Sequence, residues 1–348
     1  MRAYGSDGLA NINLKGGNVH TGHVFVVRGD MTQLACDAWL LPTDENFSVT
    51  ALWSGAVGLT QGYLRDQPRW TDDERVRLYP REDDSGSPQV WLGRVGLVKP
   101  SIDWYLQCVE SFVREAIRHV APEPGRPALL AINHVGTGNG GARFTKGDLL
   151  TALFERLQGL AREHAVDVVV VSFDERAHAA AQRARQRSLG GSRFDSVEVA
   201  IRHWTFESDD RTSMLQDQAR MLADKIRRNQ LALFLGAGVS VGARLPGWRE
   251  LIRQLADGLR EPIALSDLER LNDDRDRAAL LEKRFKAEGR ALADELVLHL
   301  GRSRYSLQHG LLSSLQVNEV ITTNFDELFE AAARTDSRPL TVLPGSAI

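Results

Sequence analysis

The stretch LALFLGAGVSVG, residues 231–242, is the part of this chain that says most about its fold. Its first five residues are apolar, and a run of that length is typical of a strand buried on both faces of a parallel sheet. The run ends at Gly236-Ala237-Gly238, where small residues let backbone N–H groups come close to a pyrophosphate. Glycine turns also follow strands in α/β proteins that bind no nucleotide, so the neighbouring sequence decides between the two interpretations.

The composition limits the class of protein. The 348 residues correspond to roughly two domains, and 43% hydrophobic residues suffice for a sizeable core. A formal net charge of -3 argues against a dedicated nucleic-acid binder. The cysteines, Cys36 and Cys108, are too few for a disulfide framework or a four-cysteine zinc site, and we expect buried, inert thiols. The N-terminus does not read as a signal peptide and no apolar run approaches about 18 residues, so we expect a cytoplasmic protein outside the membrane.

Strands and helices alternate along the chain, which predicts an α/β protein with a mostly parallel sheet covered on both faces. We expect a first domain at residues 1–205 and a second at 206–348. In the first, the patterns predict strands at 24–27, 38–41, 91–98, the start of 128–144 and 166–173, a surface excursion at 66–89, and helices at 102–120, 145–164 (with a Thr145/Asp148 capping box) and 175–187. In the second, they predict helices at 213–228 (with a Ser213/Gln216 capping box), 248–259, 266–287 and 289–300, a strand at 317–321 and a last helix through 333.

Four arginines gather at positions 183, 185, 187 and 193, beside Gly190-Gly191. A contact with nucleic acid is one interpretation of such a cluster. We favour the other, a solvated helix end that leads into a linker, because the chain as a whole carries no basic excess.

A second polar signature, TTNFD at residues 322–326, follows the strand expected at 317–321. In an open parallel sheet, ligands bind outside the carboxyl ends of the strands, so we expect this signature and GAGVS at 236–240 to face one crevice. The first signature would offer backbone donors, and the second an amide at Asn324 and a carboxylate at Asp326. The alternative is that Asp326 caps the next helix and Asn324 only ends the strand.

Together the two signatures resemble the sirtuin superfamily over residues 213–348, as do LPGW at 245–248, Glu250-Leu251 and ITTNFDELFE at 321–330. The resemblance implies a Rossmann-like fold that binds NAD. It places Asn324 at the nicotinamide ribose and the attacking water, and Asp326 at nicotinamide or in ordering the loop. The residues that it assigns to NAD contacts are Gly236, Ala237, Gly238, Ser240, Thr323 and Asp326.

Two departures refine this resemblance. Deacetylating sirtuins carry G-I-P-D-F-R after the glycine motif, whereas RLPGWR stands here at 244–249; this form resembles bacterial sirtuin-like domains of anti-phage defence, which hydrolyse NAD. The family's catalytic His-Gly follows T-x-N-x-D, but Ile348 comes before any such pair. His309-Gly310 precedes the motif, and we interpret it as part of a helix. We therefore expect an incomplete sirtuin-like fold, in a fragment or a truncated product.

The N-terminal region resembles a macrodomain, through RGDMT at 28–32 with Leu34 and Asp37-Ala38, and through VGTGNGG at 135–141. The resemblance implies a three-layer sheet in which Asp30 accepts from the adenine amino group of ADP-ribose. Gly136, Gly138 and Gly140 would wrap its diphosphate and distal ribose. LPTDEN at 41–46 replaces the family's asparagine pair and glycine triplet, which favours binding over ADP-ribosyl hydrolysis. The alternative is a macro-like fold with no ligand.

The leading hypothesis is an NAD-hydrolysing effector of anti-phage defence whose macro-like domain senses an ADP-ribose-type nucleotide or contacts a partner. Asn324 would place water against the oxocarbenium-like ribose, with a histidine beyond Ile348 as the base in a complete protein. The alternatives are a non-catalytic module that binds NAD or ADP-ribose, and a protein deacylase. The resemblance also implies a homo-oligomer or a defence partner; neither a membrane, nucleic acid nor a metal is expected.

Overall fold

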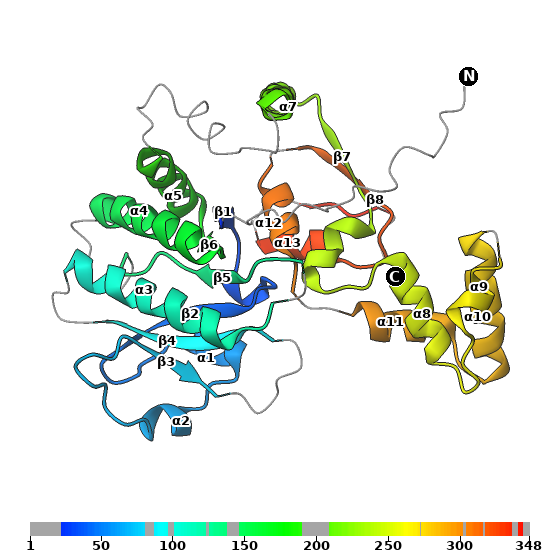
Figure 1. The fold of residues 1–348 in the computed structure, drawn as a ribbon, viewed down its shortest axis with the longest axis horizontal. Coiled ribbons are helices and arrows are strands. Elements are labelled where there is room, and N and C mark those ends of the chain that lie inside the picture. Colours follow the sequence, from blue (N-terminus) through cyan, green and yellow to red (C-terminus); the bar gives the residue numbers. More distant parts are fainter. Residues whose placement is uncertain are drawn as a thin grey trace.

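The computed structural model describes residues 22–80, 87–96, 101–122, 125–137, 146–189, 209–271, 273–301, 304–315, 317–335 and 340–343. They form an N-terminal half, residues 22–189, and a C-terminal half, residues 209–343, which lie side by side (Figure 1). The boundary expected near residue 205 lies outside the described residues. Across the described ranges, no helix combines the length and the apolar character needed to cross a membrane.

The N-terminal half is built on a six-stranded sheet in the order β1-β6-β5-β2-β4-β3. Every neighbouring pair is parallel except β3 with β4, so the prediction of a mostly parallel sheet is confirmed. The central strands are apolar on both sides because both faces of the sheet are covered. The strands are β1 (Val24–Arg28), β2 (Ala38–Asp44), β3 (Val76–Tyr79), β4 (Gln89–Gly96), β5 (Leu129–Ile132) and β6 (Asp167–Ser172).

Three helices cover one face of this sheet (Figure 1). The apolar spacing predicts all three, and the hydroxyl of Ser101 and the carboxylate of Asp174 cap two of them by accepting from first-turn backbone N–H groups. The capping residue expected at Thr145 lies outside the described residues. Cys108 is buried in this layer, as expected, and burial raises the pKa of its thiol to about 12. The helices are α3 (Ile102–His119), α4 (Lys146–His164) and α5 (Glu175–Ser188).

Among the described residues, the N-terminal half contributes only short elements to the opposite face. Phe47 stacks on Trp70 there, with 4.5 Å between the ring centroids. The prediction of a surface excursion at 66–89 is wrong for β3, whose four half-buried residues pair with β4. Such short segments lack a repeated apolar spacing, which explains why the sequence analysis missed them. The short elements are η1 (Met31–Gln33), α1 (Ala51–Val57) and α2 (Gln61–Arg65).

The C-terminal half supplies the rest of this cover. Tyr305 is fully buried and belongs, with Leu245 and Leu328, to the same hydrophobic cluster as Trp39 and Val171 of the sheet. The layer expected within residues 1–205 is therefore completed by residues that follow position 205. The physical reason is that a parallel sheet needs apolar cover on both faces, and the short elements η1, α1 and α2 are too small to provide it alone.

Backbone hydrogen bonds also join the two halves. The N–H of Tyr305 donates to the carbonyl of Gln33 at 2.9 Å, and the N–H of Ala35 donates to the carbonyl of Tyr305 at 2.8 Å. Nearby, the buried carboxylate of Asp37 accepts from the Arg244 guanidinium at 3.0 Å. A buried carboxylate needs such partners, so this ion pair ties the C-terminal half to the sheet.

Two parallel strands, β7 and β8, form the sheet of the C-terminal half, with Leu235 opposite Thr322. This sheet is smaller than the Rossmann-like sheet implied by the sirtuin resemblance, and the Rossmann-like fold remains a prediction. His309 lies in a helix, α12, as predicted. The elements are α7 (Asp209–Arg227), β7 (Ala232–Leu235), η2 (Ala237–Ala243), α12 (Leu307–Ser314), β8 (Glu319–Thr322) and α13 (Leu328–Thr335).

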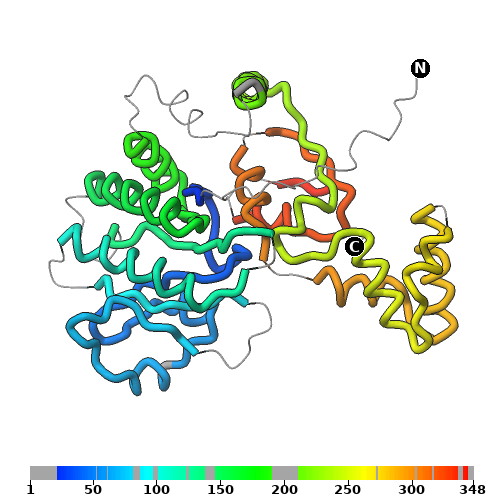
Figure 2. Tube along the Cα trace, in the orientation of Figure 1, coloured from blue at the N-terminus to red at the C-terminus, as the bar shows by residue number. Residues whose placement is uncertain are grey.

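Four further helices form an arm that extends away from the sheets, shown from yellow-green to orange in Figure 2. The arm has its own apolar core around Leu255 and Phe285. The single helix predicted at 266–287 is instead two, because Asp273 caps a new helix by accepting from the N–H of Arg275. The capping box predicted at Ser213 is also wrong, since α7 begins four residues earlier, at Asp209. The arm consists of α8 (Trp248–Asp257), α9 (Leu265–Leu268), α10 (Asp274–Ala287) and α11 (Leu292–Leu300).

Candidate functional site

A cleft of about 590 Å³ opens at the carboxyl ends of the parallel strands of the N-terminal half. We call it the nucleotide cleft. The loops after β1, β2, β5 and β6 line it, which is where ligands bind in open parallel sheets. Its size lies within the range of about 300–1,000 Å³ that is usual for small-molecule sites. Two of the predicted site residues, Asp30 and Gly136, lie in its wall.

Asp30 follows β1 and caps the short helix η1. Its Oδ1 accepts from the backbone N–H of Thr32 at 2.9 Å and from the hydroxyl of Thr32 at 2.7 Å. Its second oxygen, Oδ2, has no hydrogen-bond partner among the described residues. The loop thus holds the carboxylate in place through one oxygen and leaves the other available to an N–H donor of a ligand.

Asn133 and His134 directly follow β5 and line the same cleft, although the sequence analysis did not single them out. The side-chain oxygen of Asn133 is buried, and no described residue donates to it. His134 Nε2 lies 2.8 Å from the hydroxyl of Ser172. Burial lowers the pKa of His134 to about 4, against the opposing effect of the Asp174 carboxylate, so the imidazole is neutral at neutral pH. The sequence signal that could have identified Asn133 and His134 as site residues is their position directly after a strand.

Gly136 is the described member of the predicted glycine loop, because Gly138 and Gly140 lie outside the described residues. Its φ of +78° belongs to the left-handed region that favours glycine. A Cβ at this position would also lie 2.6 Å from the ring of Tyr105. Both conformation and close packing therefore require glycine here, next to the space of the cleft.

Aromatic side chains stand at the rim of the nucleotide cleft. Phe173, directly after β6, is 71% exposed although it is large and apolar, and Trp53 of α1 also lines the cleft. Exposed aromatic rings offer faces on which a nucleobase stacks. The loop after β2 is stabilised by its own hydrogen bonds, because Asp44 Oδ1 accepts from the backbone N–H groups of Asn46 and Ser48.

A smaller pocket of about 220 Å³ lies at the carboxyl ends of β7 and β8. Both predicted signatures contribute to this pocket, as expected for two signatures that face one crevice. The lining residues from them are Ala237, Ser240, Thr323, Asn324 and Asp326. Gly236 and Gly238 are not among the lining residues, and a Cβ on either would meet no atom within 4 Å. The protein itself therefore does not require glycine at these two positions.

Ser240 is the centre of a buried hydrogen-bond network behind this pocket. Its hydroxyl donates to Asp326 Oδ2 at 2.8 Å and accepts from the side-chain amide of Asn324 at 3.2 Å. Asp326 Oδ1 in turn accepts from the N–H of Leu328 at the start of α13, so the alternative in which Asp326 caps the next helix also holds. The side-chain oxygen of Asn324 is buried and has no described partner.

His309 joins this network from α12, which the sequence analysis did not foresee. Its Nδ1 accepts from the N–H of Ser306, and its Nε2 lies 3.4 Å from the hydroxyl of Ser240. The side chain is 1% exposed and does not line the pocket. Burial lowers the pKa of His309 to about 4, opposed by Asp326, so a neutral imidazole donates to Ser240 from Nε2.

Comparisons with known proteins address the N-terminal region. No family model matches this chain, and no curated protein matches it. Among solved structures, a Trypanosoma brucei macrodomain in complex with ADP-ribose is 17% identical, covers 46% of this chain and 68% of its own, and has a TM-score of 0.36. An Oceanobacillus iheyensis macrodomain with ADP is 13% identical, covers 50% and 95%, and has a TM-score of 0.37. With TM-scores below 0.5, these similarities do not assign the chain to a family.

Proposed function

We propose that the nucleotide cleft binds an ADP-ribose-type nucleotide. The observation that carries this proposal is the pair of side chains, Asp30 and Asn133, which line one cleft and each carry an oxygen without a described partner. A buried acceptor left unpaired costs about 1–3 kcal/mol, so a donor from water or a ligand is expected at Asn133. The adenine amino group suits the carboxylate, and a ribose hydroxyl suits the amide oxygen.

The remaining contacts of such a ligand follow from the lining residues. The adenine ring would stack on the exposed face of Phe173, close to Asp30. The diphosphate would lie along the backbone at Gly136, where no side chain intervenes. We infer binding and not hydrolysis at this cleft, because LPTDEN at 41–46 replaces the asparagine pair and glycine triplet of the macrodomain family.

Calorimetric titration with ADP-ribose tests this proposal. We expect saturable binding, weakened by Asp30→Ala by about tenfold or more, as for a lost charge-assisted hydrogen bond. Asp73→Asn is the matched control, because Asp73 is an exposed carboxylate of the same half that lines no cleft. Absence of binding to the wild-type chain at millimolar ADP-ribose sinks the proposal.

We further propose that the pocket at the ends of β7 and β8 binds the nicotinamide-ribose end of NAD and hydrolyses NAD. The unpartnered oxygen of Asn324 supports this, since it can accept from water or a ribose hydroxyl. Water would attack C1′ of the ribose, the bond from C1′ to the pyridinium nitrogen would break, and nicotinamide, ADP-ribose and a proton would result. The pocket of about 220 Å³ holds one end of this dinucleotide, and the other end would extend along Ala237.

The biological role proposed here is that of an NAD-hydrolysing effector in bacterial anti-phage defence, with the N-terminal domain (1–205) as nucleotide sensor and the C-terminal domain (206–348) as hydrolase. It rests on the resemblance of LPGW at 245–248 to such effectors. A module that binds NAD or ADP-ribose without turnover is the second candidate, favoured by the neutral, buried state of His309, which is poorly suited to act as a base.

Release of nicotinamide from NAD separates these candidates. We expect release by the wild-type chain and loss of it in Asn324→Ala. Asn318→Ala is the matched control, because Asn318 is exposed and lines no part of the pocket. Tight NAD binding without nicotinamide release would favour the binding module, and release only with an acylated peptide would favour a deacylase.

A further inference from the structure

A second hollow, of about 440 Å³, adjoins the nucleotide cleft. The two share His134, Thr137 and Ala177 in their walls, so the spaces are contiguous. The rest of the second hollow is formed by the first turn of α4 and by one side of α5. We call it the arginine groove, after Arg176, Arg183 and Arg187, which line it.

The charges along this groove are almost all positive. Arg176, Arg183 and Arg187 lie seven and four residues apart and therefore on one side of α5, and Lys146 adds a fourth cation from α4. None of these four forms an ion pair with a described residue. The one lining carboxylate, Asp174, accepts from the N–H of Ala177 as the cap of α5.

The arginines of α5 differ in their partners, depending on the side of the helix from which they extend. Arg185, which points elsewhere, donates to the carbonyl of Val24 at 3.0 Å, and burial lowers its pKa. Arg183 and Arg187 are exposed and face the groove. Arg193 lies outside the described residues, and the three described members of the arginine cluster divide into one structural residue and two that remain available to an anion. Guanidinium groups bind carboxylate and phosphate alike in a bidentate manner, and the gathering of several cations favours the more highly charged phosphate monoester as that anion.

We propose that the arginine groove holds an additional phosphate group of the nucleotide in the cleft, carried on its adenosine ribose. The inference rests on the proposed function of the cleft. The shared wall at His134 and Ala177 lies beside the loop after β6, where Phe173 would stack the adenine. A phosphate ester on the adjacent ribose therefore reaches the groove, while the diphosphate lies at Gly136. The preferred ligand is then an ADP-ribose-type nucleotide with phosphate beyond its diphosphate.

The test compares ADP-ribose with ADP-ribose 2′-phosphate by calorimetry on the full chain. We expect the phosphorylated ligand to bind about tenfold more tightly at low salt, with the difference shrinking as salt screens the exposed guanidinium groups. Arg183→Ala with Arg187→Ala should abolish the difference and leave ADP-ribose affinity within about twofold. The Lys substitutions at both positions should restore only part of the difference, because the charge is kept but the bidentate hydrogen bonds are lost.

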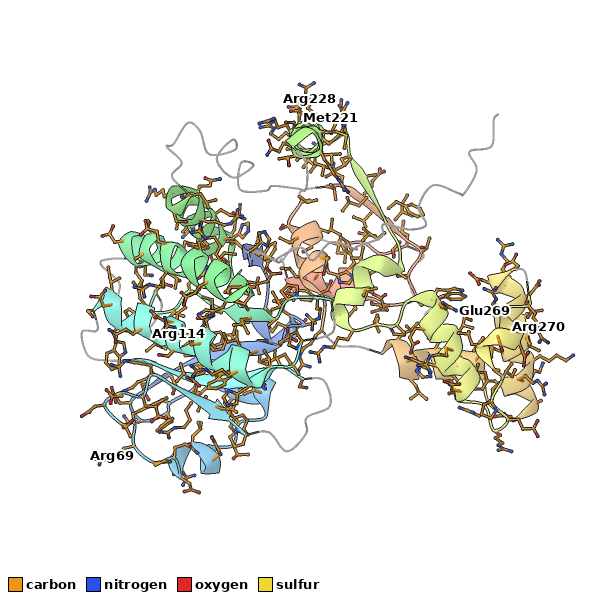
Figure 3. The ribbon with its side chains drawn as sticks, in the orientation of Figure 1. Arg69, Arg114, Met221, Arg228, Glu269 and Arg270 are labelled. Atoms are coloured by element: carbon orange, nitrogen blue, oxygen red, sulfur yellow. The ribbon has the colours of Figure 1, made fainter. Side chains whose placement is uncertain are left out.

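Arg65→Ala with Arg69→Ala is the matched control, since these exposed arginines have the same spacing and line neither space. Figure 3 shows Arg69 beside α2, well away from α5. Equal affinities for the two ligands in the wild-type chain overturn the inference and leave the proposed function intact. Failure of both ligands to bind overturns both. Binding of a short oligodeoxyadenylate that depends on Arg183 and Arg187, without discrimination between the nucleotides, assigns the groove to nucleic acid and overturns the inference.

Discussion

The nucleotide cleft lies at the carboxyl edge of a six-stranded sheet, whereas the pocket of the C-terminal half lies at the ends of two paired strands. Each carries an asparagine, Asn133 or Asn324, whose buried side-chain oxygen has no described partner. The strands that hold the two sites differ in how deeply they are buried. The strands around the cleft are buried on both faces, but Phe234 of β7 and Ile321 of β8 are 70% and 54% exposed.

This difference shows two ways of holding a polar site in place. The cleft is positioned by apolar packing, as at Gly136 against Tyr105. The pocket depends on the buried hydrogen bonds of Ser240 and on the junction at Tyr305, which joins its half to the larger sheet. We therefore expect damage at the junction or in the network to affect the pocket more than the cleft.

The largest effect is expected from Tyr305→Ala. Tyr305 is fully buried between the two halves, so its loss should lower the free energy of unfolding by about 3–5 kcal/mol through the cavity that remains. Urea unfolding measures the change. Tyr305→Phe keeps the ring and removes the hydroxyl, which donates to the Asp30 carbonyl and accepts from the Thr335 hydroxyl, so it should cost about 1 kcal/mol. A loss below 1 kcal/mol for the alanine variant contradicts a stabilising role for the junction.

Gly136→Ala should be the next most damaging, at about 2–3 kcal/mol, since alanine is strained at φ +78° and its Cβ meets the Tyr105 ring. ADP-ribose affinity should fall with it, because this backbone borders the cleft. Thermal unfolding and calorimetry give both values. Gly159→Ala within α4 is the control; its Cβ meets open space, and alanine should leave stability unchanged or raise it. An unchanged ADP-ribose affinity in Gly136→Ala would falsify the placement of the ligand.

His309→Gln should sharpen the comparison directly. Removing the Nε2 contact with Ser240 should cost about 1–2 kcal/mol and weaken NAD binding, while ADP-ribose binding at the cleft stays unchanged. Parallel titrations with the two ligands distinguish these effects. His119→Gln, an exposed histidine of α3, serves as the control. An equal loss of affinity for NAD and for ADP-ribose would show instead that the pocket and the cleft are not stabilised independently of each other.

A pH dependence of the free energy of unfolding is also expected. Burial holds the pKa of His134 and His309 at about 4, below the unfolded value of about 6.5. The unfolded chain therefore binds more protons between these values, so the stabilisation is complete above pH 6.5 and is lost as the pH falls towards 4. Each histidine should contribute about 2 kcal/mol of this loss between pH 7 and pH 4.5. Urea unfolding at pH 7 and pH 4.5 tests it: His309→Gln should lose less stability than the wild type, and an identical loss argues against a buried neutral His309.

Much of the fold follows from local pattern. The apolar run 231–235, the strand at 166–173 and the helix at 102–120 are recovered with each boundary shifted by at most one residue. Such elements depend on the spacing of nearby apolar residues, which the sequence displays directly. The segments 51–65 and 76–79 were missed because each is too short to show a period.

In the candidate sites too, some residues can be recognised from the local sequence, whereas others depend on contacts between distant parts of the chain. The sequence alone identifies the polar residues that follow the strands, Asp30, Ser240 and Asn324, because each strand and the turn after it depend on neighbouring residues. Three other placements depend on long-range packing. Tyr305 covers the N-terminal sheet, and His309 contacts Ser240, which lies 69 positions away in the sequence. Arg183 and Arg187 face a groove, whereas Arg185 does not. Contacts between distant residues form because the burial of apolar surfaces brings them together, and the spacing of apolar residues in the sequence does not reveal which surfaces pack against each other.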